Sequence, residues 1–488
     1  MTEHPVLIVG AGPTGMMLAA ELALANIDVA VIERRPTRDL AGLRAGGLHP
    51  RTLEILDQRG VAERFISQGQ KHASLHLHVP LHMSELPTRH NYVLALTQNH
   101  IERILADWVE GDLAVPIQRG CEVVGFVQDD SGVEVTLSHG ERRRVQFLVG
   151  CDGGRSRVRK AAGIGFPGWD ATTSWLIAEA QVREEPPRGF REDAHGTHAI
   201  GTLQDGRSVR VVLTEPQLAV GDEPTVADLR EELIAIFGTD FGVHDVSWIS
   251  RFTDLTRQAE RYRAGRVLLA GDAAHVHPPM GGQGLNVGLQ EAVNLGWKLA
   301  QVIRRQSPVD LLDTYHTERH PVAACVLRNT MVEVALRRTD ERSRALRESH
   351  YELLSMVEPS QHRAARLAAL DVSYAPGGRH PLVGRRIPDL DLVTREGPRR
   401  IFSLLHRARP VLINFAEGFG RALAPWESCV EIVDARCDGA WELPLLGRVL
   451  APPAVLIRPD GYVAWVGECA DPGLAEELLR WVGSPVAA

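Results

Sequence analysis

The sequence predicts an α/β (α+β) protein with a Rossmann-like nucleotide-binding domain, an inserted antiparallel sheet and a smaller C-terminal domain. Three observations lead to this prediction. Apolar strand-like runs followed by glycine-rich turns recur before residue 290, alternating apolar and polar residues occupy much of 171–262, and a new strand pattern follows a Pro/Gly-rich break at 375–381. The length of 488 residues allows about two to four domains.

The composition argues against several classes of protein. The 54 Lys and Arg against 62 Asp and Glu give a net charge of −8, which disfavours a dedicated nucleic-acid-binding protein. There is no apolar run of about 18 residues and no secretory signal at the N-terminus, so we expect a cytoplasmic protein that does not bind membranes. The six cysteines form no Cys-x-x-Cys pair, so we expect neither a metal site nor a dithiol redox centre.

The first element is a βαβ unit at the N-terminus. A buried-strand run at residues 5–9 leads into Gly10-x-Gly12-x-x-Gly15, a helical stretch follows, and a second strand ends at Glu33. In such a unit Gly10 makes the tight turn, Gly12 lets the backbone approach a pyrophosphate, and Gly15 lets the helix pack on the strand. Glu33 can accept hydrogen bonds from a ribose and disfavours NADP at this site, but the motif does not distinguish FAD from NAD.

A second strand-turn-helix element lies near residue 270. A buried-strand run at residues 266–270 ends at Gly271-Asp272, and the glycine-rich stretch 278–286 opens a long helix. A carboxylate at the end of a strand suits a ligand hydroxyl. Backbone N–H groups at residues 284–286 can hold negative charge on a ring carbonyl, and the glycines let a flat ring lie against bare backbone.

A third strand and turn lie between these two elements in the chain. A strand at residues 147–150 leads to Asp152-Gly153. A basic helix start follows, formed by Arg155, Arg157, Arg159 and Lys160. Taken alone, this segment is equally compatible with an ordinary strand-to-helix turn whose basic side chains face solvent.

Together, the three motifs resemble the FAD-binding set of the class A (single-component) flavoprotein aromatic hydroxylases, the p-hydroxybenzoate hydroxylase type. They occur in the order of that family, and residues 44–54 and 284–292 resemble it further. The resemblance covers roughly residues 5–330. Within the family, the chain is similar to actinomycete aromatic polyketide hydroxylases and to rifampicin monooxygenase.

The resemblance implies a set of site residues. It implies that Arg44 lies near a mobile flavin and assists its reduction, and that Pro278 and Pro279 belong to a loop over the isoalloxazine. Leu43 departs from the family, which usually has Ser before this arginine. The implied FAD-binding residues are Gly10, Gly12, Pro13, Thr14, Gly15, Glu33, Arg34, Arg44, Gln98, Val123, Asp152, Gly153, Gly271, Asp272, Pro279, Gly282, Gln283, Gly284, Leu285 and Asn286.

The resemblance also implies a reaction. NADPH would reduce FAD, O₂ would form a flavin C4a-hydroperoxide, and one oxygen atom would pass to a phenolic, polycyclic polyketide-type substrate. No second Gly-x-Gly-x-x-Gly unit is present, so NADPH would bind transiently. The alternatives left open are Baeyer–Villiger or epoxidising chemistry, oxidation that inactivates an aromatic antibiotic, and a flavin-bound protein without oxygenation. The sequence does not choose between a monomer and a homodimer.

The expected domains follow from these patterns. Residues 1–70, 96–170 and 263–375 form the FAD-binding domain with its following helices, and residues 71–95 and 171–262 form a substrate-binding sheet over the flavin. Residues 384–488 resemble a thioredoxin-like C-terminal domain, which we expect to serve packing or oligomer contact because it lacks Cys-x-x-Cys. The arginines at 363 and 366 are interpreted as a solvated helix face.

Overall fold

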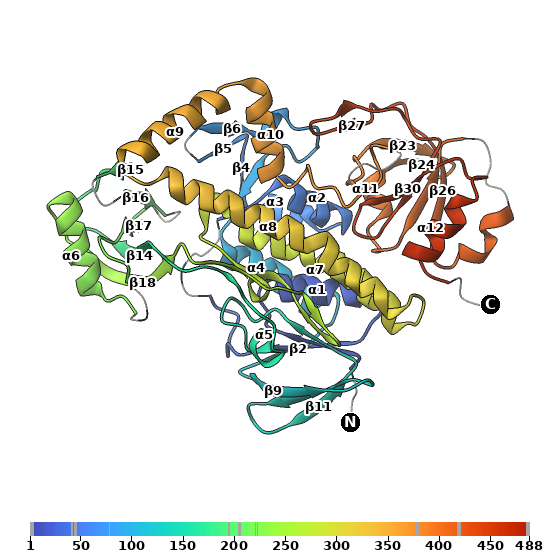
Figure 1. The fold of residues 1–488 in the computed structure, drawn as a ribbon, viewed down its shortest axis with the longest axis horizontal. Coiled ribbons are helices and arrows are strands. Elements are labelled where there is room, and N and C mark those ends of the chain that lie inside the picture. Colours follow the sequence, from blue (N-terminus) through green and yellow to red (C-terminus); the bar gives the residue numbers. More distant parts are fainter. Residues whose placement is uncertain are drawn as a thin grey trace.

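The computed structural model of the chain describes residues 4–40, 42, 46–77, 79–193, 196–203, 206–219, 221, 223–375, 380–416 and 421–484. Figure 1 shows a central α/β body, a sheet with an outer helix at one end and a C-terminal α/β body at the other. The predicted mixture of α and β structure is confirmed. Within the described ranges, no helix combines the length and apolarity that a bilayer crossing requires.

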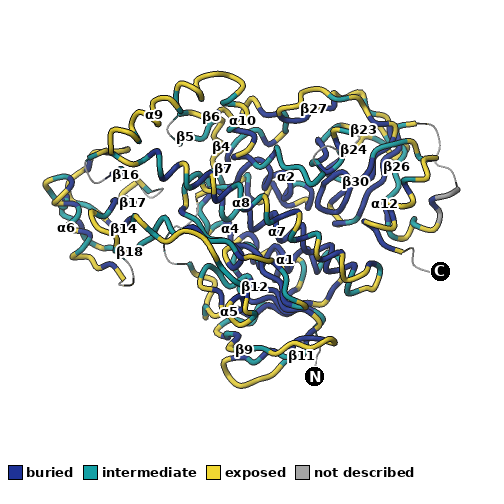
Figure 2. The backbone as a smooth tube through the Cα atoms, in the orientation of Figure 1, coloured by how far each residue is buried: buried dark blue, intermediate teal, exposed yellow. Residues whose placement is uncertain are grey.

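A six-stranded sheet forms the centre of the molecule, with strand order β20-β21-β12-β1-β2-β8. All its neighbours pair in parallel except β20, an antiparallel edge strand. The central strands are rich in Val, Ile and Leu because both faces are covered, and Figure 2 shows them buried. The strands are β1 (Val6–Val9), β2 (Val29–Glu33), β8 (Ile117–Arg119), β12 (Phe147–Gly150), β20 (Arg263–Ala264) and β21 (Val267–Leu269).

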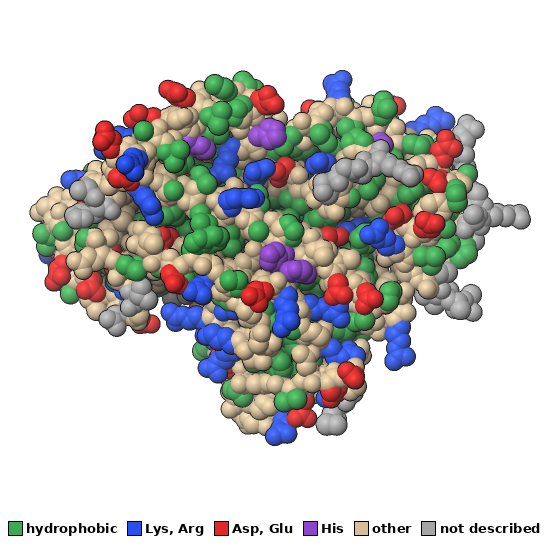
Figure 3. Space-filling model, viewed as in Figure 1, with side chains coloured by type: hydrophobic (Ala, Val, Ile, Leu, Met, Phe, Trp, Pro, Cys, Tyr) green, Lys and Arg blue, Asp and Glu red, His purple; other side chains and the backbone are tan. Residues whose placement is uncertain are grey.

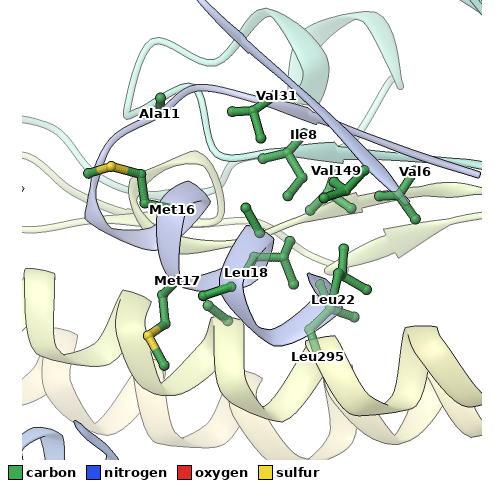
Figure 4. Packing of buried hydrophobic residues seen from close by; sticks show 14 of the residues in the cluster. Val6, Ile8, Ala11, Met16, Met17, Leu18, Leu22, Val31, Val149 and Leu295 are labelled. Atoms are coloured by element: carbon green, nitrogen blue, oxygen red, sulfur yellow. The ribbon is translucent and has the colours of Figure 1, made fainter. Parts of the chain in front are cut away.

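Helix α1 (Pro13–Leu24) lies between this sheet and α7 (Gln283–Ile303), as Figure 4 shows around Leu295. The two helices approach closely because glycines face the contact. A Cβ atom on Gly288 would lie 2.3 Å from the Thr14 hydroxyl oxygen. Each leucine that this packing buries stabilises the fold by about 1.5–3 kcal/mol, so the contact fixes the start of α7 relative to the N-terminal glycine turn.

Shorter elements flank the central sheet. Small antiparallel sheets are formed by β3 (Gly47–Leu48), β7 (Val93–Ala95) and β4 (Gln70–His72); by β5 (Ser74–His76) and β6 (Pro80–His82); by β9 (Val123–Gln128), β10 (Val133–Leu137) and β11 (Arg142–Val145); and by β13 (Gly168–Trp169), β19 (Thr256–Gln258) and β22 (His275–Val276). The helices here are α2 (Pro50–Gln58), α3 (Ala62–Ile66), α4 (Gln98–Ala106), which continues as a π-helix (Asp107–Asp112), and α5 (Arg157–Ala161). Single 3₁₀ turns occupy Met83–Glu85, Gly271–Ala273, Met280–Gly282, Val309–Leu312 and Arg421–Trp426.

A five-stranded antiparallel sheet lies beside the central body, with strand order β15-β16-β17-β14-β18. Helix α6 (Val226–Phe237) covers one of its faces, where Leu176 and Leu213 of the sheet and Leu229 of the helix belong to one buried cluster. The strands of residues 70–95 pair among themselves and with β3, so they do not join this sheet. Its strands are β14 (Ser174–Gln181), β15 (Gly189–Glu192), β16 (Thr197–Thr202), β17 (Ser208–Thr214) and β18 (His244–Thr253).

Helices α8 (Asp313–Leu336), α9 (Glu341–Leu354) and α10 (Val357–Leu367) follow α7. The interpretation of Arg363 as a solvated residue is wrong. Its side chain is 13% exposed, and its guanidinium group donates to Glu333 over 2.8 Å, which ties α10 to α8. Arg366 fits the solvated interpretation better, with a side chain that is 47% exposed.

The C-terminal region contains a second six-stranded sheet, with order β24-β23-β26-β25-β29-β30. Its only parallel pair among the described strands is β25 with β26, and a hairpin with a turn at Gly461 joins β29 to β30. The elements are β23 (Asp391–Thr394), β24 (Gly397–Arg400), α11 (Ile401–Leu404), β25 (Val411–Asn414), β26 (Glu431–Arg436), β27 (Glu442–Leu443), β28 (Gly447–Arg448), β29 (Ala454–Ile457), β30 (Val463–Gly467) and α12 (Gly473–Trp481).

A buried ionic cluster joins this C-terminal region to α7 and α8. Arg458 donates to the two carboxylate oxygens of Glu318 over 2.6 and 2.9 Å, and Lys298 donates to Glu318 over 2.7 Å. Asn294 donates to Asp460 over 3.1 Å. All five residues are at most 7% exposed. Because charges are costly to bury without partners, this cluster stabilises one particular arrangement of the two regions.

Candidate functional site

The parallel strands of the central sheet bring the three sequence motifs to one edge. Val9 pairs with both Ile32 and Gly150, and Gly150 pairs with Leu269. The turns that follow these residues therefore lie side by side at the carboxyl ends of the strands. In open α/β sheets this edge is where ligands bind.

The N-terminal glycine turn has one open position. Gly10 has a φ of +103°, and a Cβ atom on Gly15 would lie 1.9 Å from the carbonyl oxygen of Gly10, so chain packing explains these two glycines. At Gly12, which caps α1, a Cβ atom would meet nothing within 4 Å. The structure therefore leaves space for an anion at the helix N-terminus, where N–H groups lack intrahelical partners.

Glu33 belongs to a network of charged and polar side chains beside this turn. Its carboxylate accepts hydrogen bonds from the N–H of Ala11 over 2.7 Å and from the N–H of Arg35 over 2.8 Å. Arg35 also donates to Glu102 over 2.9 Å, and Glu102 accepts from Gln98 over 2.8 Å. Glu33 and Gln98 are thus brought together through Arg35 and Glu102, which sequence reasoning missed. The signal was present in Glu102, four residues after Gln98 and so on the same helix face.

Arg34, one of the predicted FAD-binding residues, is exposed, whereas Arg35 is half-buried in the network. We expect Arg35→Ala to weaken FAD binding about tenfold, because Glu33 and Glu102 would then face the dinucleotide phosphates without their cation. Titration of the flavin-free protein with FAD, followed by flavin fluorescence, measures this. Arg38→Ala is the control, because among the described residues Arg38 pairs with two acids nearer the surface, Asp107 and Glu110. Equal losses in the two variants would contradict the expectation.

A buried carboxylate, that of Glu291, fixes the turn at Gly271-Asp272. Glu291 is fully buried and accepts from the N–H of Gly271 over 2.8 Å and from His275 Nε2 over 2.9 Å. Burial opposes a charged imidazole, but the charge of Glu291 prevails and raises the pKa of His275. Gly271 has a φ of +62°, and Asp272 is exposed at the turn. After Arg35 and Glu102, Glu291 is a third residue to which the sequence analysis assigned no role.

The side chain of Asn286 fixes the end of the glycine-rich loop by hydrogen bonds. Gly281 and Gly282 have positive φ values of 77° and 64°, and α7 begins at Gln283. The side chain of Asn286 accepts from the N–H of His49 over 2.9 Å and donates to the carbonyl of Gly282 over 2.9 Å. Its amide group thus fixes the loop, which leaves the backbone N–H groups at the start of α7 for a ligand. In the loop itself, Pro278 is buried and Pro279 is exposed.

The carboxylate of Asp152 hydrogen-bonds to the start of α5. It accepts from the N–H of Arg157 over 2.7 Å and from the Ser156 hydroxyl, which caps α5. The solvated interpretation is wrong for Arg159, which is 4% exposed and donates to the carbonyl of Ala273 over 2.8 Å. This bond ties the Asp152-Gly153 turn to the Gly271 turn.

The remaining predicted residues differ in position. The Thr14 hydroxyl contacts the Gly271 and Gly288 backbones, Pro13 is the first residue of α1, and Gly153 has a φ of +78°. Val123 is 3% exposed in β9. Leu43 and Arg44 lie outside the described residues.

The residues at this edge fit FAD. Gly12 offers an open anion site, the starts of α1 and α7 offer backbone donors, and the buried Nε2 atom of His277 has no partner among the described residues. The described part of the chain holds no group of three or more His, Cys, Asp or Glu that could bind a metal ion. Acidic and basic side chains are interspersed over the face shown in Figure 3.

A cavity of about 350 Å³ lies on the other side of the start of α7. It is lined by α7, α8, the end of α10 and the segment that follows it, and its walls include Val287, Val322, Val326 and Leu367.

Comparisons with known proteins identify the family. A family model described as FAD binding domain matches residues 3–330, and one described as aromatic-ring hydroxylase, C-terminal, matches residues 380–485. The chain is 42% identical over 506 residues to the 12-dehydrotetracycline 5-monooxygenase/anhydrotetracycline 6-monooxygenase of Streptomyces rimosus subsp. rimosus, with 99% of each chain covered. It is 41% identical over 494 residues to the rifampicin monooxygenase of Streptomyces venezuelae, again with 99% of each covered.

A solved structure agrees with these relatives. The OxyS anhydrotetracycline hydroxylase from Streptomyces rimosus superposes with a TM-score of 0.93 at 42% identity, over 99% of this chain and 100% of that one. The similarity thus includes the C-terminal region as well as the glycine turns. The chain therefore belongs to the FAD-dependent aromatic-ring hydroxylases related to actinomycete polyketide hydroxylases, and it is a flavoprotein monooxygenase.

Proposed function

We propose that the protein is an FAD- and NAD(P)H-dependent monooxygenase that hydroxylates a phenolic, polycyclic natural product of the polyketide type. The observation that carries the proposal is the face of the five-stranded sheet that α6 leaves uncovered. There the buried Trp175 stacks on the half-buried Phe252 with ring centroids 5.2 Å apart, and the half-buried Ile177 and Val212 pair beside them. Such a surface suits a large, flat aromatic substrate.

This uncovered face is turned toward the flavin-binding part. Trp248, paired with Glu179 on the same face, packs on Gly42 so closely that a Cβ atom there would lie 2.0 Å from its ring. Gly42 belongs to residues 1–70, which we assign to the FAD-binding domain, so a substrate on this face would lie beside that domain. We also assign Arg44 a role in flavin movement and reduction.

The residue roles follow from the site. Gly12 and the start of α1 bind the pyrophosphate, Glu33 the ribose, Asp272 the ribityl chain, and the loop with Pro278 and Pro279 covers the ring. Bound FAD supplies hydride acceptance from NAD(P)H and oxygen activation at its C4a atom. The net reaction consumes NADPH, a proton, O₂ and the phenol, and yields NADP⁺, water and the hydroxylated product. The protein orients the two rings and excludes water.

We further propose the division into domains given by the sequence, with 384–488 as a thioredoxin-like unit. One change is needed: the strands of residues 70–95 pair among themselves and with β3, apart from the five-stranded sheet. The role of the C-terminal unit is packing, and the buried cluster around Glu318 and Arg458 supports this. A structural unit of this kind needs no redox-active cysteine pair.

A second candidate function is oxidation of a finished aromatic antibiotic, which the 41% identical rifampicin monooxygenase favours. Aerobic NADPH oxidation by the FAD-loaded protein tests both candidates. Anhydrotetracycline, an angucyclinone and rifampicin are the probes, and we expect one of them to accelerate oxidation at least about tenfold. The reaction is run under ¹⁸O₂, and NMR spectroscopy of the isolated product then distinguishes hydroxylation from lactone or epoxide formation. Acceleration without an oxygenated product would overturn the proposal.

A further inference from the structure

His277 has a buried ring nitrogen that the fold itself does not use. The residue lies between the His275–Glu291 pair and the Pro278 loop. Its Nδ1 atom is 2.9 Å from the carbonyl oxygen of Pro278. Its Nε2 atom is buried and has no hydrogen-bond partner within the described part of the chain. A buried polar atom without a partner is uncommon, and it points to a ligand.

The unpaired nitrogen faces the start of α7. The position that a Cβ atom would occupy on Gly284 lies 3.4 Å from His277 Nε2 and 4.0 Å from a carboxylate oxygen of Asp272. The two side chains therefore flank the same stretch of bare backbone. A glycine at 284 leaves this space to a ligand, and the space lies in the proposed FAD site, next to the residue that holds the ribityl chain.

The hydrogen-bonding character of Nε2 follows from its surroundings. A carbonyl oxygen only accepts, so Nδ1 must carry the proton that it shares with Pro278. Burial, helped by the neighbouring His275, lowers the pKa of His277 to about 4, so the ring is neutral near pH 7. In a neutral imidazole with a protonated Nδ1, Nε2 is an acceptor. Its missing partner must therefore be a donor.

We propose that His277 is an FAD-binding residue whose Nε2 accepts a hydrogen bond from a hydroxyl group of the ribityl chain. The ribityl chain carries hydroxyl groups, which can donate hydrogen bonds. It would then donate to two acceptors, this nitrogen and the carboxylate of Asp272. The inference depends on the FAD site and not on the proposed substrate. Binding measured without substrate or NADPH can thus fail or succeed independently of the hydroxylation.

The test compares two substitutions at this position in the flavin-free full-length protein. His277→Phe keeps a ring but removes the acceptor, and we expect the Kd for FAD to rise about tenfold. His277→Gln places an amide oxygen near the position of Nε2, and we expect binding to stay within about threefold of wild type. His316→Phe is the matched control, because His316 is a half-buried histidine on α8 outside the site.

FAD analogues lacking one ribityl hydroxyl provide a measurement on the unaltered chain. We expect one of them to bind about tenfold more weakly to wild type and no more weakly than FAD to His277→Phe. Should the Phe variant not fold, His277→Leu, which also lacks an acceptor, replaces it in both titrations. Equal affinity for FAD and every such analogue, or equal losses in the Phe and Gln variants, would overturn the proposal.

Discussion

Gly12→Asp is expected to abolish flavin binding at micromolar FAD while leaving the fold intact. A side chain at this position meets nothing within 4 Å, and the backbone angles of −73° and 179° are allowed for any residue. An aspartate at a helix N-cap accepts hydrogen bonds from the first-turn N–H groups. Its carboxylate would therefore occupy the site of the pyrophosphate and repel it. We expect the Kd for FAD to rise at least about 100-fold, about 2.7 kcal/mol.

Titration with FAD measures the loss of flavin binding, and thermal unfolding of the flavin-free protein shows whether the fold stays intact. Gly125→Asp is the charge control, because a Cβ atom at Gly125 in β9 also meets nothing within 4 Å. Gly12→Ala should bind FAD far better than Gly12→Asp, because it adds bulk without charge. A Gly12→Asp protein that purifies yellow, with wild-type affinity, would show that the pyrophosphate lies elsewhere.

Glu318→Ala is expected to destabilise the protein by about 3–5 kcal/mol, because Lys298 and Arg458 would stay buried after losing a shared partner. Urea unfolding followed by circular dichroism measures the change. Glu185→Ala is the control: its carboxylate is 77% exposed and pairs with Arg188, so about 0–1 kcal/mol is expected. A shift in Glu318→Ala no larger than that of the control would mean that the cluster does not hold the two regions together.

The same cluster predicts how stability depends on pH. Burial alone would raise the pKa of Glu318, but Arg458 and Lys298 hold it well below its usual 4.5. Its contribution is therefore present above pH 4.5 and is lost as the pH falls. Burial lowers the pKa of Lys298 from 10.5 to about 8. Between about pH 8 and pH 10.5, Lys298 is protonated in the unfolded chain but largely neutral in the folded protein, so the free energy of unfolding rises with pH. Lys298→Met should remove this rise.

Residues close together in the sequence were enough to predict the glycine turns of the site. Gly10 and Gly15 are required because carbonyl groups and neighbouring backbone approach where a side chain would lie. Val- and Ile-rich runs identified the buried strands, since both faces of a parallel sheet are covered. The separate pairing of residues 70–95 was not predicted, because alternation shows that a segment is a strand but not which strand it pairs with.

Only the tertiary structure could decide the partners of the charged groups. The sequence by itself determined the strand-glycine-helix turns, the acid at Glu33 and the carboxylate at Asp272, because these depend on residues close together in the chain. The fold decided that Arg363 is half-buried and paired with Glu333, that Glu291 holds the Gly271 turn, and that His277 keeps a nitrogen without a partner among the described residues. Burial and hydrogen bonding depend on what packs against a side chain, and those neighbours come from distant parts of the chain.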